Sequence, residues 1–431
     1  MVRARIGIGH LGSRMFRAQS AKMTTPPSEP SALERLQGAR IAIVHDWCPD
    51  FRGGERVLAR FCRLFPEADV FTLFDFLAPE VKTRHFGDRI FHTSPLNRLP
   101  GVRRYYRSLF ALCPFFIEQF NVTDYDLVLS SSSAFARGVL TRPDQPHVCY
   151  VHSPARYAWD EQFTYLEQAR LGFGPKGLLY RYMLHGLRIW DARTAHGPDL
   201  MVANSEYVRA RIRRIYGRDA MVIHPPVDVD EMPFTAQKGD YYVAASFLAP
   251  YKRTDLVLRA FRAMPERRLV VVGEGQQSAG LRALAAPNIS FTGYLDRQQY
   301  VDVVRKAKGM VFAGCEDFGI ALAEAQAAGT PLIAYAQGGA RDIVRPLGSD
   351  NPTGVLFQQQ SVESIRGAVE MFERNLAAIS PSACRQNAQR FSVERFDRDI
   401  QAAVAQALAI HDGDVRAVPL MISGNPVRAA D

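Results

Sequence analysis

The chain has 431 residues and a net charge of +9, with 47% hydrophobic and 23% charged residues. These proportions are ordinary for a globular protein, and no apolar run reaches the roughly 18 residues that a membrane-spanning helix needs. The length predicts two domains with full cores. The positive charge is compatible with nucleic acid, an anionic membrane or phosphorylated substrates and does not choose among them.

Six cysteines are scattered along the chain without a C-x-x-C pair. This spacing argues against a zinc site and against a disulfide framework. It fits a reducing compartment, so we expect a cytoplasmic protein.

Residues 1–38 differ in composition from the rest. They are rich in arginine, contain no acid before Glu29 and include a Pro/Ser/Thr-rich stretch at residues 24–31. Two interpretations fit, a transit peptide and a disordered extension, and we favour disorder; the apolar core of a secretory signal is not seen. A flexible tail is expected at residues 412–431.

The first domain is predicted at residues 39–226. It opens with a buried strand at residues 40–45 and a loop that leads to Gly53 and Gly54, which start a helix. A strand, a Gly-rich turn and a helix are typical of a phosphate-binding loop. The turn is not G-x-G-x-x-G and the later ribose-binding acid is absent, so a dinucleotide site is disfavoured. A plain βα turn is the alternative.

Residues 98–120 are basic and aromatic. Arginines stand beside apolar side chains at near-helical spacing, namely Tyr105, Leu109, Leu112, Phe116 and Phe120. One interpretation is a segment that lies on an anionic membrane, with its arginines on lipid phosphates. The other is an ordinary core-facing helix, interrupted at Pro114.

An apolar strand is expected at residues 147–151, and it delivers His152 at its carboxyl end, with Arg156 four residues later. Ligands bind at the carboxyl ends of strands in open α/β sheets. This position therefore favours a functional histidine over the more common structural one.

Strands continue to alternate with helices along the chain. A long helix is expected at residues 174–196, an interdomain linker near residues 225–240, a second domain at residues 227–390 and a final helix at residues 391–411. Strands separated by helices imply right-handed βαβ units and a parallel sheet in each domain. Two such domains leave a cleft, which is a usual place for a ligand.

A basic pair, Lys252 and Arg253, stands at the start of a helix predicted in the second domain. The helix dipole disfavours cations at this end, so an exposed pair without a partner is unfavourable. An anion bound nearby would explain the pair.

Residues 309–331 predict a buried strand, an acidic turn and a helix that ends at Gly329. The start of a helix presents free N–H groups and a positive dipole end, which suit a phosphate. Glu316 precedes this helix and Glu324 lies within it. Eight residues are close to a whole number of turns, so we expect both carboxylates to face one cleft. The alternative is a pair of ordinary acids, one complementing the dipole and one solvated.

Three motifs carry a resemblance to a known family. Glu316 and Glu324 match the E-x7-E signature of the retaining glycosyltransferases of family 4, which share the GT-B fold. HSPARYAWD at residues 152–160 resembles the branch of O-antigen and exopolysaccharide mannosyltransferases, and Pro-Pro-Val-Asp at residues 225–228 fits the same family. The resemblance covers residues 39–411. It implies an α/β GT-B protein, with two Rossmann-like parallel-sheet domains facing a cleft and a final helix that crosses back to the first.

The resemblance also implies roles for individual residues. His152 and Glu316 would be catalytic, with Glu316 on the sugar hydroxyls. The expected donor-binding residues are Lys252, Arg253, Gly293, Tyr294, Phe318, Gly319, Ile320 and Glu324, the last on the ribose. Gly53, Gly54 and Arg156 would shape the acceptor side. The chain departs from the family at Phe247, where an arginine usually grips the donor diphosphate.

No metal site is expected. Asp228 and Asp230 have the D-x-D spacing of the metal-binding motif of another glycosyltransferase fold, but they follow two prolines in the predicted linker. Asp228 is already part of the family 4 pattern. We therefore expect metal-independent chemistry without a cofactor.

Together these features predict a retaining glycosyltransferase that moves mannose from GDP-mannose to a lipid-linked or glycan acceptor in cell-surface polysaccharide synthesis. It would be cytoplasmic, with or without peripheral contact to the inner face of the plasma membrane, and would not bind nucleic acid. The alternatives are a GT-B nucleotide-sugar epimerase or hydrolase, and a non-enzymatic protein that binds phosphosugars or nucleic acid.

Overall fold

The computed structural model describes residue 36 and residues 38–411. The expected N-terminal extension, apart from residues 36 and 38, and the expected tail at residues 412–431 lie outside the described residues. Within residues 38–411, no helix is both long enough and apolar enough to cross a membrane.

The first sheet has seven strands in the order β3-β2-β1-β4-β5-β6-β7, and every neighbouring pair is parallel. The strand order reverses between β1 and β4, which places a switch point at the carboxyl edge of the sheet. The strands are β1 (Ile41–His45), β2 (Asp69–Thr72), β3 (Phe91–Thr93), β4 (Leu127–Ser132), β5 (His147–Val151), β6 (Leu200–Ala203) and β7 (Met221–Val222).

Both faces of this sheet are covered, which explains why its central strands are apolar throughout. Ile41 and Ile43 of β1 point into one core, and Ala42 and Val44 point into the other. Helices α2 (Gly53–Leu64) and α3 (Pro79–Phe86) contribute to the first core. The second core is completed by α4 (Cys113–Ile117) and α6 (Pro175–Thr194), while α5 (Gln162–Gln168) and α7 (Glu206–Tyr216) complete the first half of the chain.

The second sheet has six parallel strands in the order β10-β9-β8-β11-β12-β13. These are β8 (Tyr242–Ala245), β9 (Leu269–Val272), β10 (Ile289–Gly293), β11 (Gly309–Phe312), β12 (Leu332–Tyr335) and β13 (Gly354–Phe357). One core packs α10 (Arg297–Lys306) and α11 (Ile320–Ala327) on this sheet. The other packs α8 (Thr254–Arg262), α9 (Ser278–Arg282) and α13 (Val362–Arg374) on its opposite face, and α12 (Ala340–Ile343) and α14 (Pro381–Ala388) complete the set. The predicted α/β fold with two parallel-sheet units is confirmed.

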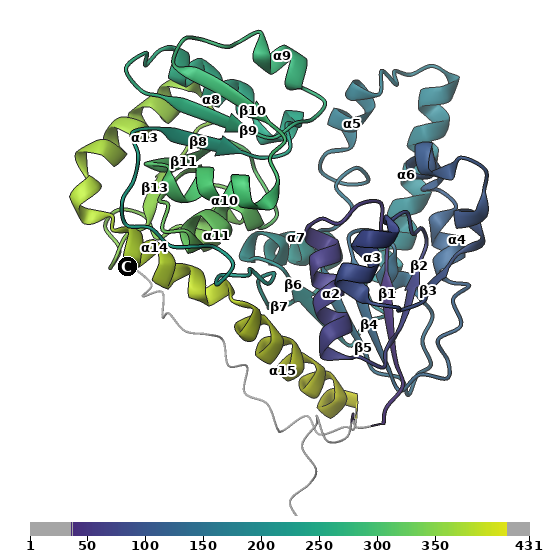
Figure 1. Cartoon of the computed structure of the whole chain (residues 1–431). Helices are drawn as coiled ribbons and strands as arrows, with labels where there is room; N and C mark the ends of the chain where they lie inside the picture. Colours follow the sequence, from purple (N-terminus) through teal and green to yellow (C-terminus); the bar gives the residue numbers. More distant parts are fainter. Residues whose placement is uncertain (1–35, 37, 412–431) are drawn as a thin grey trace, which may run out of the picture.

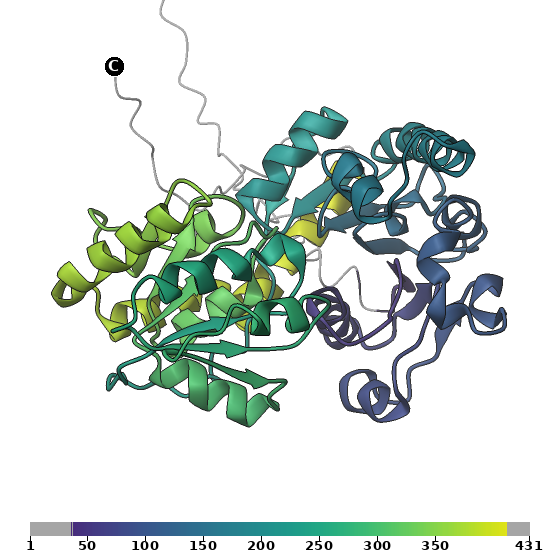
Figure 2. The same cartoon turned by 90° about the horizontal axis from the view of Figure 1, so that it is seen from above.

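The last helix, α15 (Val393–His411), leaves the second sheet and packs on the first (Figure 1, Figure 2). Phe396 is buried there and stacks on Phe61 with ring centroids 5.9 Å apart. Arg60 forms an ion pair with Asp397. The chain therefore crosses between the two sheets a second time, which joins the units by more than the segment near residues 225–240.

Residues 98–120 do not form the single helix that their spacing suggested. They form short 3₁₀ turns followed by α4, and Pro114 stands in the first turn of that helix, where its missing N–H is tolerated. The buried side chains are shifted from those expected; they are Val102, Tyr106, Phe110, Cys113 and Ile117. Tyr105 and Leu112 are exposed, because a broken helix does not keep one phase.

Candidate active site

A pocket of about 500 Å³ opens between the two sheets. Its walls come from both units, at the carboxyl ends of their strands, where ligands bind in folds of this kind. The first unit contributes Gly53, Gly54, His152, Arg156, Glu161 and Asn204; the second contributes Phe247, Lys252, Glu316, Asp317, Phe318, Gly319 and Ile320.

The N-terminus of α11 faces this pocket. Gly319 precedes the helix with a φ of 99°, a left-handed conformation that strains any residue with a side chain. A Cβ there would also lie 3.0 Å from Glu316 Oε2. The first N–H groups of a helix have no partner within it, so Phe318, Gly319 and Ile320 bring backbone donors to the pocket wall.

Lys252 and Glu316 meet in the pocket. Lys252 ends a 3₁₀ turn (Pro250–Lys252) and forms an ion pair with Glu316. Burial lowers the pKa of the Lys252 ammonium to about 7, with Asp317 opposing the shift and Arg156 adding to it. The structure thus places a buried cation and a carboxylate beside the helix N-terminus.

Glu324 does not share the pocket wall with Glu316. Its side chain is buried one turn into α11 and is held by Arg56 Nη1 at 2.9 Å and Arg297 Nη1 at 2.8 Å. Burial raises the pKa of this carboxyl, but the charges of Arg56 and Arg297 outweigh burial and the pKa is lowered. Arg56 belongs to α2, so Glu324 also faces the first unit, although it does not line this pocket. That both glutamates serve one donor stays a prediction.

His152 lies at the end of a buried polar chain. His45 Nδ1 is 3.0 Å from Ser131 Oγ, and Ser131 Oγ is 2.8 Å from His152 Nε2. Burial, together with the nearby His45, lowers the pKa of His152 to about 3. The imidazole is therefore neutral at physiological pH and serves as a hydrogen-bonding group rather than a cation.

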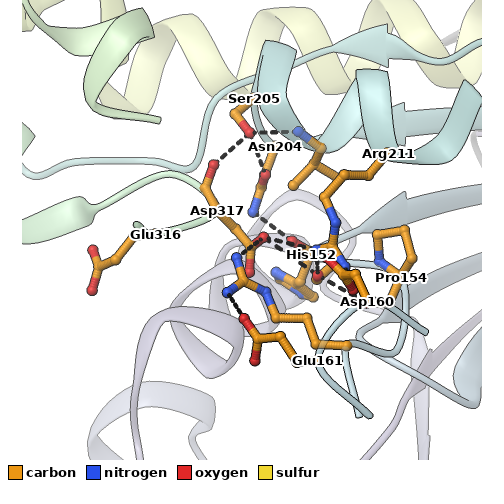
Figure 3. A network of polar contacts seen from close by, with 12 residues as sticks. His152, Pro154, Asp160, Glu161, Asn204, Ser205, Arg211, Glu316 and Asp317 are labelled. Carbon is orange, nitrogen blue, oxygen red and sulfur yellow. Dashed lines mark hydrogen bonds and ion pairs between the residues drawn. The ribbon is translucent and has the colours of Figure 1, made fainter. Parts of the chain in front are cut away.

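Arg156 reaches across the cleft to Asp317, in a network drawn in Figure 3. Its Nη2 lies 2.7 Å from Asp317 Oδ1, and its Nη1 lies 2.9 Å from Glu161 Oε1. Burial lowers the pKa of the guanidinium, but the neighbouring Asp317 and Glu161 charges raise it overall. Gly53 and Gly54 line the same pocket from the start of α2.

Besides Glu324, three more of the predicted donor-binding residues are not among those that line the pocket, namely Arg253, Gly293 and Tyr294. Arg253 precedes α8 and its Nε lies 3.3 Å from Asp255 Oδ1. Gly293 ends β10, and the adjacent Tyr294 is exposed. Their donor roles stay predictions.

Sequence reasoning missed several residues that surround the site. Arg56 and Arg297 hold Glu324, and Arg211 holds Asp317. Arg52 lies with its guanidinium 5.1 Å from the ring centroid of Phe247, so a first-unit cation covers the position where the family resemblance expects an arginine. The arginine directly before Gly53 and Gly54, which were already expected at the acceptor side, is a signal that could have pointed to Arg52.

Family models match both units of the chain. Residues 51–231 match the model described as Glycosyltransferase Family 4, and residues 233–391 match Glycosyl transferases group 1. The chain belongs to the family 4 glycosyltransferases. Within the part of the chain that the structure describes, no group of three or more His, Cys, Asp or Glu side chains is arranged to hold a metal ion.

Curated relatives of this family 4 chain are distant. A "GDP-mannose-dependent monoacylated alpha-(1-6)-phosphatidylinositol monomannoside mannosyltransferase" of Corynebacterium glutamicum is 28% identical over 216 residues, which is 42% of this chain and 55% of the relative. A "D-inositol 3-phosphate glycosyltransferase" of Mycobacterium sp. is 27% identical over 251 residues, 51% of this chain and 55% of the relative. The chain spans about half the length of the curated relatives it matches.

Solved structures share the fold of this chain. The sucrose-phosphate synthase of Thermosynechococcus elongatus has a TM-score of 0.64 at 17% identity, over 86% of this chain and 100% of the other. HepE of Anabaena, solved with UDP and glucose, has a TM-score of 0.61 at 17% identity, over 84% of this chain and 99% of the other. These likenesses show the GT-B fold.

Proposed function

We propose that this family 4 glycosyltransferase is a retaining, metal-independent enzyme that transfers mannose from GDP-mannose to a lipid-linked or glycan acceptor. One observation carries the proposal. The pocket between the sheets joins the N-terminus of α11, Lys252 and Glu316 on one side to His152 on the other. This arrangement offers an anion site and a sugar site facing each other across one cleft.

The anion site suits a nucleoside diphosphate as leaving group. Negative charge grows on the diphosphate as the bond to the sugar breaks, and donors that are already in place stabilise it without reorganising. The backbone N–H groups at the start of α11 and the buried ammonium of Lys252 are such donors. Together they supply fixed positive charge from the protein itself.

Lys252 and Glu316 are paired with each other before the donor binds, and each can exchange this partner for a group of the donor. A bound diphosphate would compete with Glu316 for the ammonium, because both are anions that need the same partner. Glu316 released in this way would be free to accept hydrogen bonds from the sugar hydroxyls. Neutral His152 would contact the donor sugar from the opposite wall.

The choice of GDP-mannose rests on the family branch suggested by residues 152–160 and on a relative whose name includes GDP-mannose-dependent mannosyl transfer. A thermal-shift screen of nucleotides and nucleotide sugars tests it, since a ligand that binds the native state raises the apparent Tm. GDP-mannose should give the largest shift, with UDP-glucose as the matched contrast. Sugar release without an acceptor would instead support an epimerase or hydrolase, and a response to nucleic acid alone would contradict an enzyme of this class.

Metal independence has its own test. The proposed positive charges all come from protein groups, so transfer should continue at an unchanged rate in EDTA. A rate lost in EDTA and restored by Mg²⁺ or Mn²⁺ would contradict this account of the diphosphate site.

We further propose that the protein works on the cytoplasmic face of a membrane that holds its acceptor. Exposed apolar side chains gather on α5, α6 and the segment between them, namely Phe163, Phe173, Leu178, Leu179, Tyr182 and Ile189. Exposed basic residues lie in the neighbouring segment at residues 98–110, among them Arg103, Arg104 and Arg107. Apolar side chains flanked by arginines fit an anionic lipid surface.

A further inference from the structure

The loop between β11 and α11 is held by the first unit through Asp317 (Figure 3). Asp317 Oδ1 accepts from Arg156 Nη2 at 2.7 Å and from Arg211 Nη1 at 3.3 Å. Ser153 Oγ donates to the same oxygen at 3.3 Å. All three partners belong to the first unit, so this carboxylate is paired across the cleft.

The turn between β6 and α7 holds two loops at once. Asn204 Nδ2 donates to the carbonyl oxygen of His152 at 2.9 Å, and Ser205 Oγ donates to the carbonyl oxygen of Asp317 at 2.5 Å. Ser205 is itself fixed, because its Oγ caps α7 by accepting from the N–H of Val208 at 3.1 Å. Two adjacent side chains therefore tie the backbone of the His152 loop to the backbone of the Glu316 loop.

The charges of this cluster are balanced without Asp317. Arg211 Nη2 donates to Asp160 at 2.6 Å and Arg156 Nη1 donates to Glu161 at 2.9 Å, so the first unit pairs each arginine with its own acid. In the part of the chain that the structure describes, the ion pairs of Asp317 all run to these two arginines. The arginines do not need Asp317 for their own neutralisation, whereas both arginines that form ion pairs with Asp317 belong to the first unit.

We propose that Asp317 is a positioning residue. It is held in place across the cleft by the Asn204–Ser205 turn, Arg156 and Arg211. The inference rests on the proposed function. Glu316 directly precedes Asp317 in the chain and points away from the cluster in Figure 3, while Phe318 and Gly319 lead into α11. Seating Asp317 therefore sets the sugar-facing carboxylate and the anion-binding helix end against His152. A displacement of about 1 Å at such a group costs on the order of 10²-fold in rate.

The test compares Asp317→Asn with a matched carboxylate of the same interface. Asp317→Asn keeps the shape of the side chain and removes its charge. Asp342 also bridges the two units, accepting from the N–H of Glu206 at 2.8 Å and lying 3.2 Å from His224 Nε2, but it does not line the pocket. We expect Asp317→Asn to lower kcat for sugar transfer by about 10- to 100-fold. In the same variant, the KM for the nucleotide sugar and the Kd of the free nucleoside diphosphate (NDP) should change by less than about 3-fold. The control, Asp342→Asn, should keep kcat within about 3-fold of the unchanged protein.

Amide hydrogen exchange supplies a readout that does not depend on catalysis. The amides of residues 314–319 should exchange faster in Asp317→Asn than in the unchanged protein, and at the unchanged rate in Asp342→Asn. If the protein binds no nucleotide sugar at all, the proposed function fails while the exchange result still tests the seating of the loop. Exchange and kcat that stay unchanged in Asp317→Asn would overturn the inference. An equal loss of kcat in Asp342→Asn would also overturn it, because the effect would then be a general loosening of the interface.

Discussion

Lys252 is the residue on which the chemistry of the pocket depends most directly. Its side chain is only 11% exposed, it is paired with Glu316, and it lies beside the helix end that faces the cleft. Glu324, by contrast, is enclosed by Arg56 and Arg297. The two glutamates of the E-x7-E motif therefore stand in different surroundings and should respond differently to substitution.

Substitutions should distinguish the roles of Lys252, Glu324 and Glu316 in NDP binding and in sugar transfer. Lys252→Ala removes a preorganised cation, which typically costs on the order of 10²–10³ in rate, and it should weaken both NDP and NDP-sugar. Glu324→Ala should also weaken both ligands, since ribose is common to them. Glu316→Ala should keep or strengthen NDP binding, because it removes the carboxylate that competes for Lys252, while sugar transfer is lost. Calorimetry with NDP beside a transfer assay measures both effects.

Glu370→Ala, a substitution of an exposed glutamate on α13, is the matched control and should change neither property. If Glu316→Ala and Glu324→Ala lost NDP affinity equally, or if both kept full transfer, the division of roles between the two glutamates would be wrong.

The lowered pKa of Lys252 predicts a pH dependence for donor binding. The free protein holds this pKa at about 7, and a bound diphosphate favours the protonated form and raises it. Binding therefore takes up a proton, and affinity for the NDP-sugar should be steady below pH 7 and fall by up to about tenfold per pH unit above it. An NDP-sugar is the right probe, because its diphosphate does not titrate in this range. Lys252→Arg stays charged, so calorimetry from pH 6 to pH 9 should find no such fall in affinity. An equal fall in both proteins would show that a group other than Lys252 causes it.

At the scale of elements, α6 shows two apolar faces. Tyr180, Met183, Leu184, Leu187 and Trp190 pack on the first unit, and Leu178, Leu179, Tyr182 and Ile189 remain exposed. A helix that is apolar on its outer side indicates a surface that meets another apolar phase. The membrane hypothesis for residues 98–120 thereby gains an adjacent apolar surface.

Two variants should release the protein from anionic vesicles. Arg103, Arg104 and Arg107 changed together to Glu should weaken binding, each basic residue near such a surface contributing about 1 kcal/mol. Leu178→Gln with Leu179→Gln should weaken it through the apolar contribution, which salt does not screen. Vesicle sedimentation measures both, and NDP binding should be unaffected.

The control carries the same change of charge on the second unit, with the exposed Arg259, Arg262 and Arg374 changed to Glu. Vesicle binding that falls equally in this control would reflect net charge alone. Binding that is unchanged in both proposed variants would place the surface outside any membrane contact.

At the scale of the whole molecule, α15 makes the first core depend on the end of the chain. Phe396, Ile400, Ala403, Val404 and Ala407 are buried in the same core as β1 and α2. Residues more than three hundred positions apart thus complete one hydrophobic core, which couples the folding of the first unit to the presence of the last helix.

Phe396→Ala should test this dependence. Phe396 is buried between Phe61 and Tyr150, with both ring centroids 5.9 Å away, so truncation should lower the free energy of unfolding by about 3–5 kcal/mol. Urea denaturation followed by circular dichroism measures it. Ile410→Ala, at an exposed position of the same helix, should cost far less. Equal small losses in both would show that the first unit is stable without α15.

Much of the fold and part of the site could be predicted from the sequence, because the signals are local. β1, β5 and β11 each fall where a short apolar run predicts a strand, and Ser205 and Asp296 cap the helices that follow them. The acidic turn before α11 is also predictable from local sequence, because Gly319 and a run of helix formers follow it. These features depend on residues within a few positions of each other.

Only the tertiary structure decided which charges meet. Arg56 and Glu324 are 268 positions apart, and Arg211 and Asp317 are 106 positions apart, so no spacing in the sequence could pair them. The phase of residues 98–117 was likewise set by packing against the sheet rather than by local periodicity. Local periodicity determines strands and helices, whereas the contacts of long charged side chains across a cleft depend on how two separately folded sheets come together.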